Sequence, residues 1–425
     1  MKRIIFSLVL ALGTLANAAG QGLSGDWSGP LNVQGQALTL VFHLALAGDA
    51  PTATFDSPDQ GARGIEARVV FASADSVCLT VPRIGARFAG HAENEQIIGT
   101  FAQSGYSFPL TLTRGYAKPR RPQTPQPPFP YETREISFLN AHDSVRLAGT
   151  LTLPACAANE AVPCVVMVSG SGLQNRDEEI FDHKPFLVLA DYLARRGIAS
   201  LRYDDRGCGA SKCAGAEYAT TADFARDAAA ALDFLREEAT AGAANCQLST
   251  VNCQLPRIGI LGHSEGANIA LMMAAQGRAN FAVSLAAVGV RGDTALTAQA
   301  NALRAVRAMP QMSVSDYRQN AEAQGVPWLN YFLDYDPSPD IRAARCPVFA
   351  LNGANDWQVL SALNLSAIRQ KLPANPQNQV REYPGLNHLF QHALTGLPEE
   401  YGKIEETLAP EVMADIADWI LGLKN

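Results

Sequence analysis

The sequence predicts a two-domain α/β protein, in which a small antiparallel β domain precedes a larger domain built on a mainly parallel, doubly wound sheet. Short alternating apolar runs fill residues 20–114, a proline-rich stretch follows at 115–131, and apolar strands then alternate with helical patterns over residues 132–425. The 425 residues, 47% of them hydrophobic, are enough for more than one core. The net charge of −7 argues against a nucleic-acid partner, because phosphate binding needs a basic surface.

Residues 1–18 have the pattern of a secretory signal peptide. Lys2 and Arg3 form a basic start, residues 4–15 are an apolar run too short to span a bilayer, and small residues precede a cleavage position after Ala18. We therefore expect export to the periplasm or the extracellular space, with no integral membrane segment in the mature form. The alternative is a buried N-terminal helix. Loss of Lys2 and Arg3 with the leader would change the net charge from −7 to −9.

Export would expose the eight cysteines to an oxidising compartment, where thiols tend to pair. Three local pairs stand out by their spacing, with the first favoured: Cys156 with Cys164, Cys208 with Cys213, and Cys246 with Cys253. None of the cysteines has a second Cys or His at the spacing of a zinc site, so we expect no metal and no cofactor.

The β domain at residues 20–114 is predicted to be an antiparallel sandwich or small barrel, because turn residues separate short alternating runs. Examples of the expected strands are residues 37–44, 67–71, 76–81, 96–101 and 108–113. The segment 118–130 is too rich in proline for a strand or a helix, and we interpret it as a polyproline spacer. The β domain offers no chemistry of its own, so packing against the larger domain is its expected role.

The larger domain begins with a predicted β-hairpin at residues 134–139 and 145–153. Strands and helices then alternate, which is typical of a parallel sheet covered on both faces. The expected strands are 164–169, 198–203, 257–262, 281–288, 347–352 and 379–383, and the expected helices are 184–196, 220–238, 267–276 and 409–423. An insertion at about 289–340 holds two helical stretches, and we expect it to cover the strand ends as a cap.

The strongest local signal is the motif Gly-His-Ser-Glu-Gly at residues 262–266, between an apolar strand and a helical run. A serine on so sharp a turn needs small neighbours, because larger side chains would collide with the strand and the helix. This pattern in this context predicts a nucleophile elbow with Ser264 as the catalytic residue. The alternative is a glycine-rich connection with an incidental serine.

A catalytic serine needs a histidine base, and the base needs an acid that orients it. Elbow enzymes have the chain order serine, acid, histidine, and of the seven histidines only His388 and His392 follow the last plausible acid. Asp356 and His388 each come just after a predicted strand, where sites in open α/β sheets form. His392, expected one turn down a following helix, is the weaker candidate base. The competing acids, which precede the strand instead, are Asp334, Asp336 and Asp340.

An acyl-transfer site also needs backbone donors for the oxyanion. One is expected from the N–H of Glu265, directly after the nucleophile, and the second from the loop at residues 169–178. Ser171 is the first choice for the second donor and Gly172 the next. The charged residues 176–178 of this loop are expected to fix its shape rather than to act chemically.

On these motifs the chain resembles exported bacterial serine esterases of the α/β-hydrolase fold. The resemblance rests on the loop at 169–178, the run 201–211, the elbow at 262–266, Tyr-Asp-Pro at 335–337, the segment 346–359 and Asn-His at 387–388. It implies the triad Ser264, Asp356 and His388, and a small N-terminal β domain. One departure is Ser169, where the family usually has His, and this difference affects the expected shape of the acyl pocket.

The predicted reaction is hydrolysis of short-chain, small-molecule acyl esters through an acyl-enzyme. A histidine base works in its neutral form, so activity should fall in acid. A peptidase would use the same triad and would need an acceptor for a substrate amine, for which Glu265 and Glu178 are candidates. A lipase is disfavoured by the polar residues of the insertion. A non-catalytic binding protein is the remaining alternative.

Overall fold

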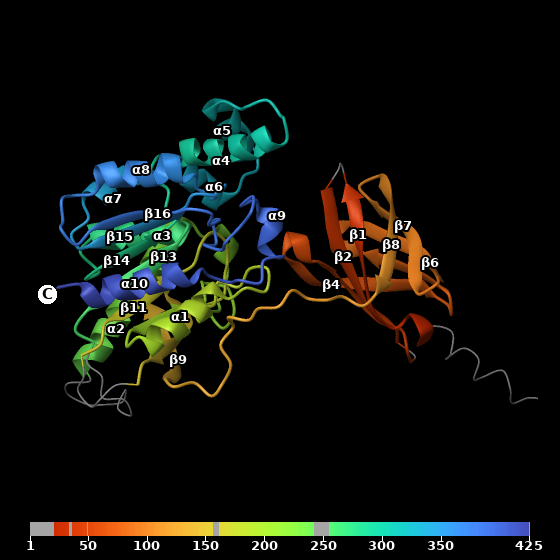
Figure 1. The fold of residues 1–425 in the computed structure, drawn as a ribbon, viewed down its shortest axis with the longest axis horizontal. Helices are drawn as coiled ribbons and strands as arrows, with labels where there is room; N and C mark the ends of the chain where they lie inside the picture. The colour runs from red at the N-terminus through yellow and green to blue at the C-terminus, as the bar shows by residue number, and fades with distance from the viewer. Residues whose placement is uncertain (1–20, 34–35, 49, 156–160, 242–254, 425) are drawn as a thin grey trace, which may run out of the picture. The chain divides into compact units, whose positions relative to one another are not determined.

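The computed structural model describes residues 21–33, 36–48, 50–155, 161–241 and 255–424 (Figure 1). The chain divides into two compact units at residues 120 and 121. The first unit has one hydrophobic core, and the second has a core on each face of a sheet. The predicted signal peptide lies outside the described residues.

The first unit is a closed antiparallel barrel of eight strands in sequential order, so of the two predicted β folds the barrel is confirmed. The strands are β1 (Gly25–Val33), β2 (Gln36–Ala45), β3 (Thr52–Ser57), β4 (Ala62–Ala72), β5 (Ser76–Val81), β6 (Ala86–Glu93), β7 (Gln96–Gln103) and β8 (Tyr106–Arg114). The barrel closes where Ser28 of β1 pairs with Thr113 of β8. Strands β2, β4, β5, β7 and β8 contain the predicted examples, and β1, β3 and β6 complete the barrel.

Inward-facing side chains fill the barrel, as expected for eight strands. Phe42 stacks on Phe88 with ring centroids 5.3 Å apart, and Phe55 stacks on Phe101 at 6.2 Å. These four rings and Trp27 are almost fully buried. The barrel therefore gains its stability from a packed apolar interior.

The second unit contains an eight-stranded sheet in the order β16-β15-β14-β13-β11-β12-β10-β9. Following this order from β16 to β12, each strand pairs in parallel with the next. At the other edge, β10 pairs antiparallel with β12, and β9 and β10 form the predicted antiparallel hairpin. The strands are β9 (Glu132–Asn140), β10 (Val145–Leu153), β11 (Cys164–Val168), β12 (Ala199–Tyr203), β13 (Ile258–His263), β14 (Ala282–Leu285), β15 (Val348–Gly353) and β16 (Gln379–Tyr383). The predicted doubly wound sheet is confirmed.

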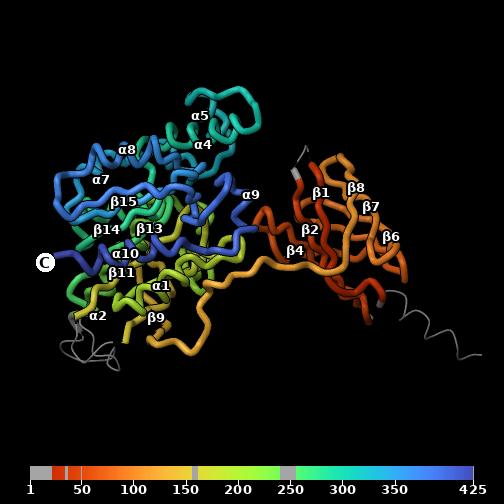
Figure 2. The backbone as a smooth tube through the Cα atoms, in the orientation of Figure 1, coloured from red at the N-terminus to blue at the C-terminus, as the bar shows by residue number. Residues whose placement is uncertain are grey.

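Helices cover both faces of this sheet, because alternate residues of each buried strand point to opposite sides. On central strand β11, Val166 belongs to the buried cluster that includes residues of α2, α3 and α8, whereas Val165 belongs to the cluster that includes residues of α1 and α10. Figures 1 and 2 show α1 and α10 together along the sheet. These helices are α1 (Pro185–Arg195), α2 (Thr221–Ala241), α3 (Glu265–Ala275), α8 (Ser361–Lys371) and α10 (Pro410–Gly422).

The insertion between β14 and β15 forms a helical cap, with more helices than the two predicted (Figure 1). Its helices are α4 (Gly292–Val306), α5 (Val314–Glu322), α6 (Pro327–Asp334) and α7 (Ser338–Arg342), and a further short helix, α9 (Pro398–Tyr401), follows β16. α5 begins at a capping box, in which Ser313 and Asp316 each accept the other's backbone N–H. Helices α4, α5 and α6 pack on one another.

Part of the proline-rich segment is held against the second unit by side-chain hydrogen bonds. Arg121 donates to the carbonyl oxygens of Phe181, Gly402 and Ile404. Gln123 accepts from the backbone N–H of Leu408 at 3.0 Å. At these positions the segment is an ordered strap on the surface of the second unit.

The predicted disulfides are not formed where the structure can test them. Cys208 and Cys213 are free thiols, and the loop between them is held by Asp204, which accepts the N–H of Ala210 at 2.9 Å. Cys164 is also free, and its burial in the sheet raises its pKa to about 12. The remaining predicted partners, Cys156, Cys246 and Cys253, lie outside the described residues. Over the described ranges, no helix is long and apolar enough to cross a bilayer.

Candidate active site

The turn between β13 and α3 holds Ser264 in a strained conformation. Its backbone angles are φ +53° and ψ −114°, and a positive φ is uncommon for a residue other than glycine. The flanking glycines allow this turn: a Cβ on Gly262 would lie 1.9 Å from the Gly266 oxygen, and a Cβ on Gly266 would lie 2.1 Å from the Val168 oxygen. Ser264 therefore occupies the sharp strand-to-helix turn that the sequence predicted.

Asp356 and His388 meet beyond the ends of neighbouring strands β15 and β16. His388 Nδ1 lies 2.8 Å from Asp356 Oδ2, and both side chains are buried. The other carboxylate oxygen, Oδ1, accepts the backbone N–H groups of Gln358 and Val359, each at 2.8 Å. These bonds fix the carboxylate, and the carboxylate orients the imidazole ring.

The weaker candidate base, His392, lies elsewhere. Its ring is exposed and contacts the carboxylates of Glu406 and Glu411. The expected helix around it is wrong: the segment forms a β-bridge between Leu386 and His392, because the N–H groups of residues 389 and 391 bond to Asn387. His392 is therefore part of a surface ion-pair cluster.

The three competing aspartates are also engaged away from His388. Asp334 pairs with Arg291 and Arg318 in the cap. The other two make local hydrogen bonds, Asp336 with the N–H of Ser338 and Asp340 with the hydroxyl of Tyr335. Of the candidate acids, Asp356 is the one that the structure places against a candidate histidine.

The loop at residues 169–178 is tied down by buried carboxylates. Glu178 Oε1 accepts the N–H of Gly170 at 2.8 Å, and Asp205 Oδ2 accepts the N–H of Gln174 at 2.9 Å. Asp204 accepts the N–H of Arg176 at 2.8 Å and also pairs with its guanidinium. Burial raises the pKa of Asp205 well above its usual range. These bonds leave the middle of the loop to present its own N–H groups.

The candidate oxyanion donors remain available within this framework. Among the described residues, the backbone N–H groups of Ser171, Gly172 and Glu265 have no hydrogen-bond acceptor. For Glu265 this follows from its place at the start of α3, where the first N–H groups have no partner within the helix. Gly170, in contrast, cannot serve as a donor because Glu178 already accepts its N–H.

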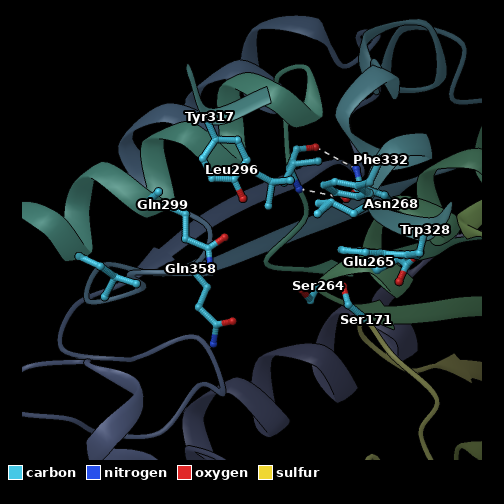
Figure 3. A pocket seen from close by; sticks show the side chains of 14 residues that line it. Ser171, Ser264, Glu265, Asn268, Leu296, Gln299, Tyr317, Trp328, Phe332 and Gln358 are labelled. Carbon is cyan, nitrogen blue, oxygen red and sulfur yellow. Dashed lines mark hydrogen bonds between the residues drawn. The ribbon is translucent and has the colours of Figure 1, made fainter. Parts of the chain in front are cut away.

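A cavity of about 410 Å³ opens between the elbow and the cap (Figure 3). Ser171 and Ser264 line it from the sheet side, whereas Leu296, Gln299 and Tyr317 line it from cap helices α4 and α5. The full lining is Ser171, Ser264, Glu265, Asn268, Val288, Leu296, Gln299, Ala300, Leu303, Tyr317, Trp328, Leu329, Phe332 and Gln358. The serine thus lies in a mainly apolar cavity between the sheet and the cap.

Glu265 connects the elbow to the cap. Its Oε1 accepts hydrogen bonds from the Thr221 hydroxyl at 2.5 Å and from the indole N–H of Trp328 at 2.7 Å. Burial raises the pKa of Glu265, although hydrogen bonds from Thr221, Trp328 and Ser171 act in the opposite direction. One oxygen of this buried carboxyl group beside the nucleophile is therefore engaged with both α2 and the cap.

A second cavity of about 380 Å³ adjoins the main one. Both cavities are lined by Ser171 and Trp328, and the second is otherwise mostly apolar, with Leu173, Phe224 and Val326 in its wall. Trp328 was not among the residues predicted from the sequence. The sequence feature that could have identified it is its place directly after Pro327, the residue that starts α6 inside the cap insertion.

We expect Trp328→Ala to relax the preference for acyl chain length, because it would join the two cavities. The ratio of kcat/KM for p-nitrophenyl octanoate to that for the acetate should rise about tenfold. Trp328→Phe is the matched control, since it keeps an apolar wall and removes only the N–H that Glu265 accepts. An unchanged ratio in the alanine variant would show that Trp328 does not limit the substrate.

Comparison with known proteins places residues 165–397, more than half of the chain, in the family described as "Alpha/beta hydrolase family". Esterase EstD of Thermotoga maritima is 24% identical over 292 residues, covering 65% of this chain and 65%, just under two thirds, of that relative's length. Among solved structures, esterase Pf2001 from Pyrococcus furiosus aligns with a TM-score of 0.46 and 15% identity over 72% of this chain and 98% of its own. Est1E from Butyrivibrio proteoclasticus, with ferulic acid bound, aligns with a TM-score of 0.46 and 15% identity. The alignment covers 67% of this chain and 98% of that protein.

Proposed function

Because this chain belongs to the alpha/beta hydrolase family, we propose that it is a serine carboxylesterase acting on short-chain acyl esters. Ser264 is the nucleophile, His388 the base and Asp356 the residue that orients the base. The observation that carries the proposal is the strained Ser264 elbow in an apolar cavity, with a buried Asp356–His388 pair on the adjoining strand ends. The esterase relative is consistent with this activity.

In the proposed mechanism, Ser264 Oγ attacks the ester carbonyl carbon while His388 Nε2 takes the hydroxyl proton. Nδ1 of the same ring donates to Asp356 Oδ2, which stabilises the imidazolium that forms. The proton then passes to the leaving alcohol oxygen, and an acyl-enzyme remains. Water, activated by the same histidine, attacks the acyl carbonyl and releases the acid.

Negative charge develops on the carbonyl oxygen during both attacks, and the N–H groups of Glu265 and Ser171 stabilise it in the proposed mechanism. Gly172 is the second choice after Ser171. Support comes from the hydrogen bonds that hold the loop on both sides, at Gly170 and Gln174, while leaving the donors between them unoccupied. A donor fixed before the reaction costs no reorganisation when charge appears.

A peptidase is the main alternative, and the two candidate acceptors for a substrate amine are both engaged. Glu178 contacts Gly170 and His263 beneath the loop. Glu265 lines the cavity, but its Oε1 already accepts from Thr221 and Trp328. Binding an ammonium group at Glu265 would compete with these contacts, so the geometry favours an ester substrate.

The test is a substrate panel with the purified chain, combined with a fluorophosphonate probe. We expect turnover of p-nitrophenyl acetate and butyrate, and covalent labelling at Ser264. Acetylated sugars in the panel would identify a carbohydrate alcohol. Faster turnover of aminoacyl p-nitroanilides would indicate a peptidase, and an absence of both turnover and labelling would indicate a binding protein.

We also propose that the enzyme is exported, on the basis of the basic start, apolar run and small-residue site in residues 1–18. Expression of the full chain in a bacterial host, followed by N-terminal sequencing of the product, tests this proposal. A product beginning just after Ala18 in the periplasmic or extracellular fraction is expected. A cytosolic product that still begins at the initiator methionine would contradict it.

A further inference from the structure

A buried carboxylate, Glu178, lies beneath the elbow and has no part in the mechanism above. Only 3% of its surface is exposed. A single oxygen, Oε1, lies 2.8 Å from the N–H nitrogen of Gly170 and 2.8 Å from Nδ1 of His263. Gly170 immediately precedes the candidate donor Ser171, and His263 immediately precedes Ser264. One carboxylate oxygen therefore holds both the loop and the elbow.

His263 extends this contact to the segment that carries the base. Its second ring nitrogen, Nε2, lies 2.9 Å from the backbone oxygen of His388, and the two rings have centroids 4.7 Å apart. Both ring nitrogens thus face acceptors. A neutral imidazole has one N–H, so it can donate to only one of them, whereas a protonated ring donates to both.

The charged surroundings favour the protonated ring. Burial acts to lower the pKa of His263, but the Glu178 carboxylate, its hydrogen bond, the His388 carbonyl and the more distant Asp356 carboxylate together raise it. Of the titratable residues, Glu178 and His388 contact the ring, and Asp356 acts on it only through its charge. The two acceptors that face the ring nitrogens, Glu178 Oε1 and the His388 oxygen, act in the same direction, because only a protonated ring can donate to both.

The backbone around Glu178 and Gly170 also has features that fit the contact between them. Glu178 has a φ of +52°, a conformation that non-glycine residues seldom adopt and that must be stabilised by its surroundings. A Cβ on Gly170 would lie 3.2 Å from Glu178 Oε1 and 3.3 Å from Ser264 Cβ. A side chain at residue 170 would thus press on both the carboxylate and the nucleophile.

From these contacts we propose that Glu178 and His263 are positioning residues that keep the oxyanion loop, the elbow and the His388 backbone in register. The proposal rests on the esterase mechanism above. Neither residue touches substrate: Glu178 and His263 are absent from the lining of the cavity that Ser264 shares with the cap. Glu178 acts through the N–H of Gly170, and His263 acts through the backbone oxygen of His388. His263 can hold both Glu178 and His388 only while each of its ring nitrogens carries a proton.

The first test is Glu178→Gln, which keeps the size of the side chain and removes its charge. The variant can still accept from Gly170, but His263 loses the partner that keeps it protonated. We expect kcat to fall about 10- to 100-fold with KM changed less than about threefold, because misplaced reacting groups slow the chemical step more than binding. Glu179→Gln is the matched control, as Glu179 is exposed and contacts Asn175 and Lys184.

The pH profile separates positioning from a general loss of structure. In the native enzyme kcat should decline on the alkaline side as His263 loses its second proton, and Glu178→Gln should move that decline to lower pH. His263→Gln should abolish the alkaline decline of kcat and should lower kcat at all pH values. The proposal would be overturned if Glu178→Gln had the same kcat and the same alkaline decline as Glu179→Gln. It would also be overturned if the fall in kcat merely matched the fraction of unfolded protein measured by circular dichroism.

A spectroscopic measurement on the native chain needs no activity, and it uses a variant only to assign one signal. In protein labelled with heavy nitrogen in histidine, His263 should show two protonated ring nitrogens across the neutral pH range, assigned from the signal that His263→Gln loses. A neutral His263 over that range would overturn the proposal. Failure of the proposed function gives a different result: no ester turnover and no fluorophosphonate labelling in the native chain, whatever the state of His263.

Discussion

Ser264→Ala is expected to lower kcat for p-nitrophenyl acetate by about 10⁵- to 10⁶-fold, because no acyl-enzyme can form without the hydroxyl. The fold should persist, since Ser264 contributes its backbone to the turn: its N–H donates to the Leu285 oxygen at 2.8 Å, and alanine keeps that bond. Stopped assays with the purified variant, together with thermal unfolding, measure both effects. Labelling by the fluorophosphonate probe should disappear in parallel.

The matched control for this variant is Ser315→Ala, an exposed serine on cap helix α5. Its activity and labelling should equal those of the native chain. Retained turnover in Ser264→Ala would show that another group is the nucleophile. Loss of activity accompanied by a large fall in melting temperature would instead point to a damaged elbow.

Asp356→Asn is expected to lower kcat by about 10³- to 10⁴-fold with little change in KM. An asparagine can keep its oxygen toward the N–H groups of Gln358 and Val359, which now bond to Oδ1. Its amide NH₂ would then face His388 Nδ1, where the carboxylate now accepts. The ring would have to present a bare Nδ1 and a protonated Nε2, so it could not take the Ser264 proton.

Steady-state kinetics of Asp356→Asn should be compared with those of Asp336→Asn, which replaces another loop aspartate by the same residue. Asp336 bonds to the N–H of Ser338 and has no contact with a histidine, so its variant should keep activity within about threefold of the native value. Equal kinetics in the two variants would remove Asp356 from the triad. His392→Gln should likewise retain activity, because that ring contacts only surface carboxylates among the described residues.

Much of the fold was predictable because local pattern and tertiary structure agree. Two strands have the predicted bounds, residues 76–81 and 379–383, since turn residues delimit each run. Barrel closure was not predictable in this way. The bond between β1 and β8 joins Ser28 to Thr113, and no local pattern distinguishes such a distant pairing from the edge of a sandwich.

The cap shows a second limit of prediction from sequence. Helix α6 is eight residues long and starts with proline, and helices this short depend on tertiary packing rather than on intrinsic propensity. It forms because Trp328 stacks on Phe332 with centroids 5.3 Å apart and bonds to Glu265 outside the cap. A pattern confined to the insertion could not reveal that distant contact.

For the candidate site, chain order and strand ends led to the same residues that the structure brings together as a pair, Asp356 and His388. The contact between Glu178 and His263 was not predictable, because the two residues are 85 positions apart and meet only when β11 and β13 pair. Glu178 was identified as a charged loop residue. Its buried position could be learned only from the packing of the sheet.

The route of the chain also makes the enzyme modular. The residues proposed to react follow β13, β15 and β16, whereas helices α4, α5 and α6 all belong to the single insertion between β14 and β15. Exchange of that insertion for one of a different sequence would change the walls of the cavity without moving the strand ends. Selectivity and chemistry thus lie on separable stretches of sequence, which makes the cap the natural target for redesign or laboratory evolution of this fold.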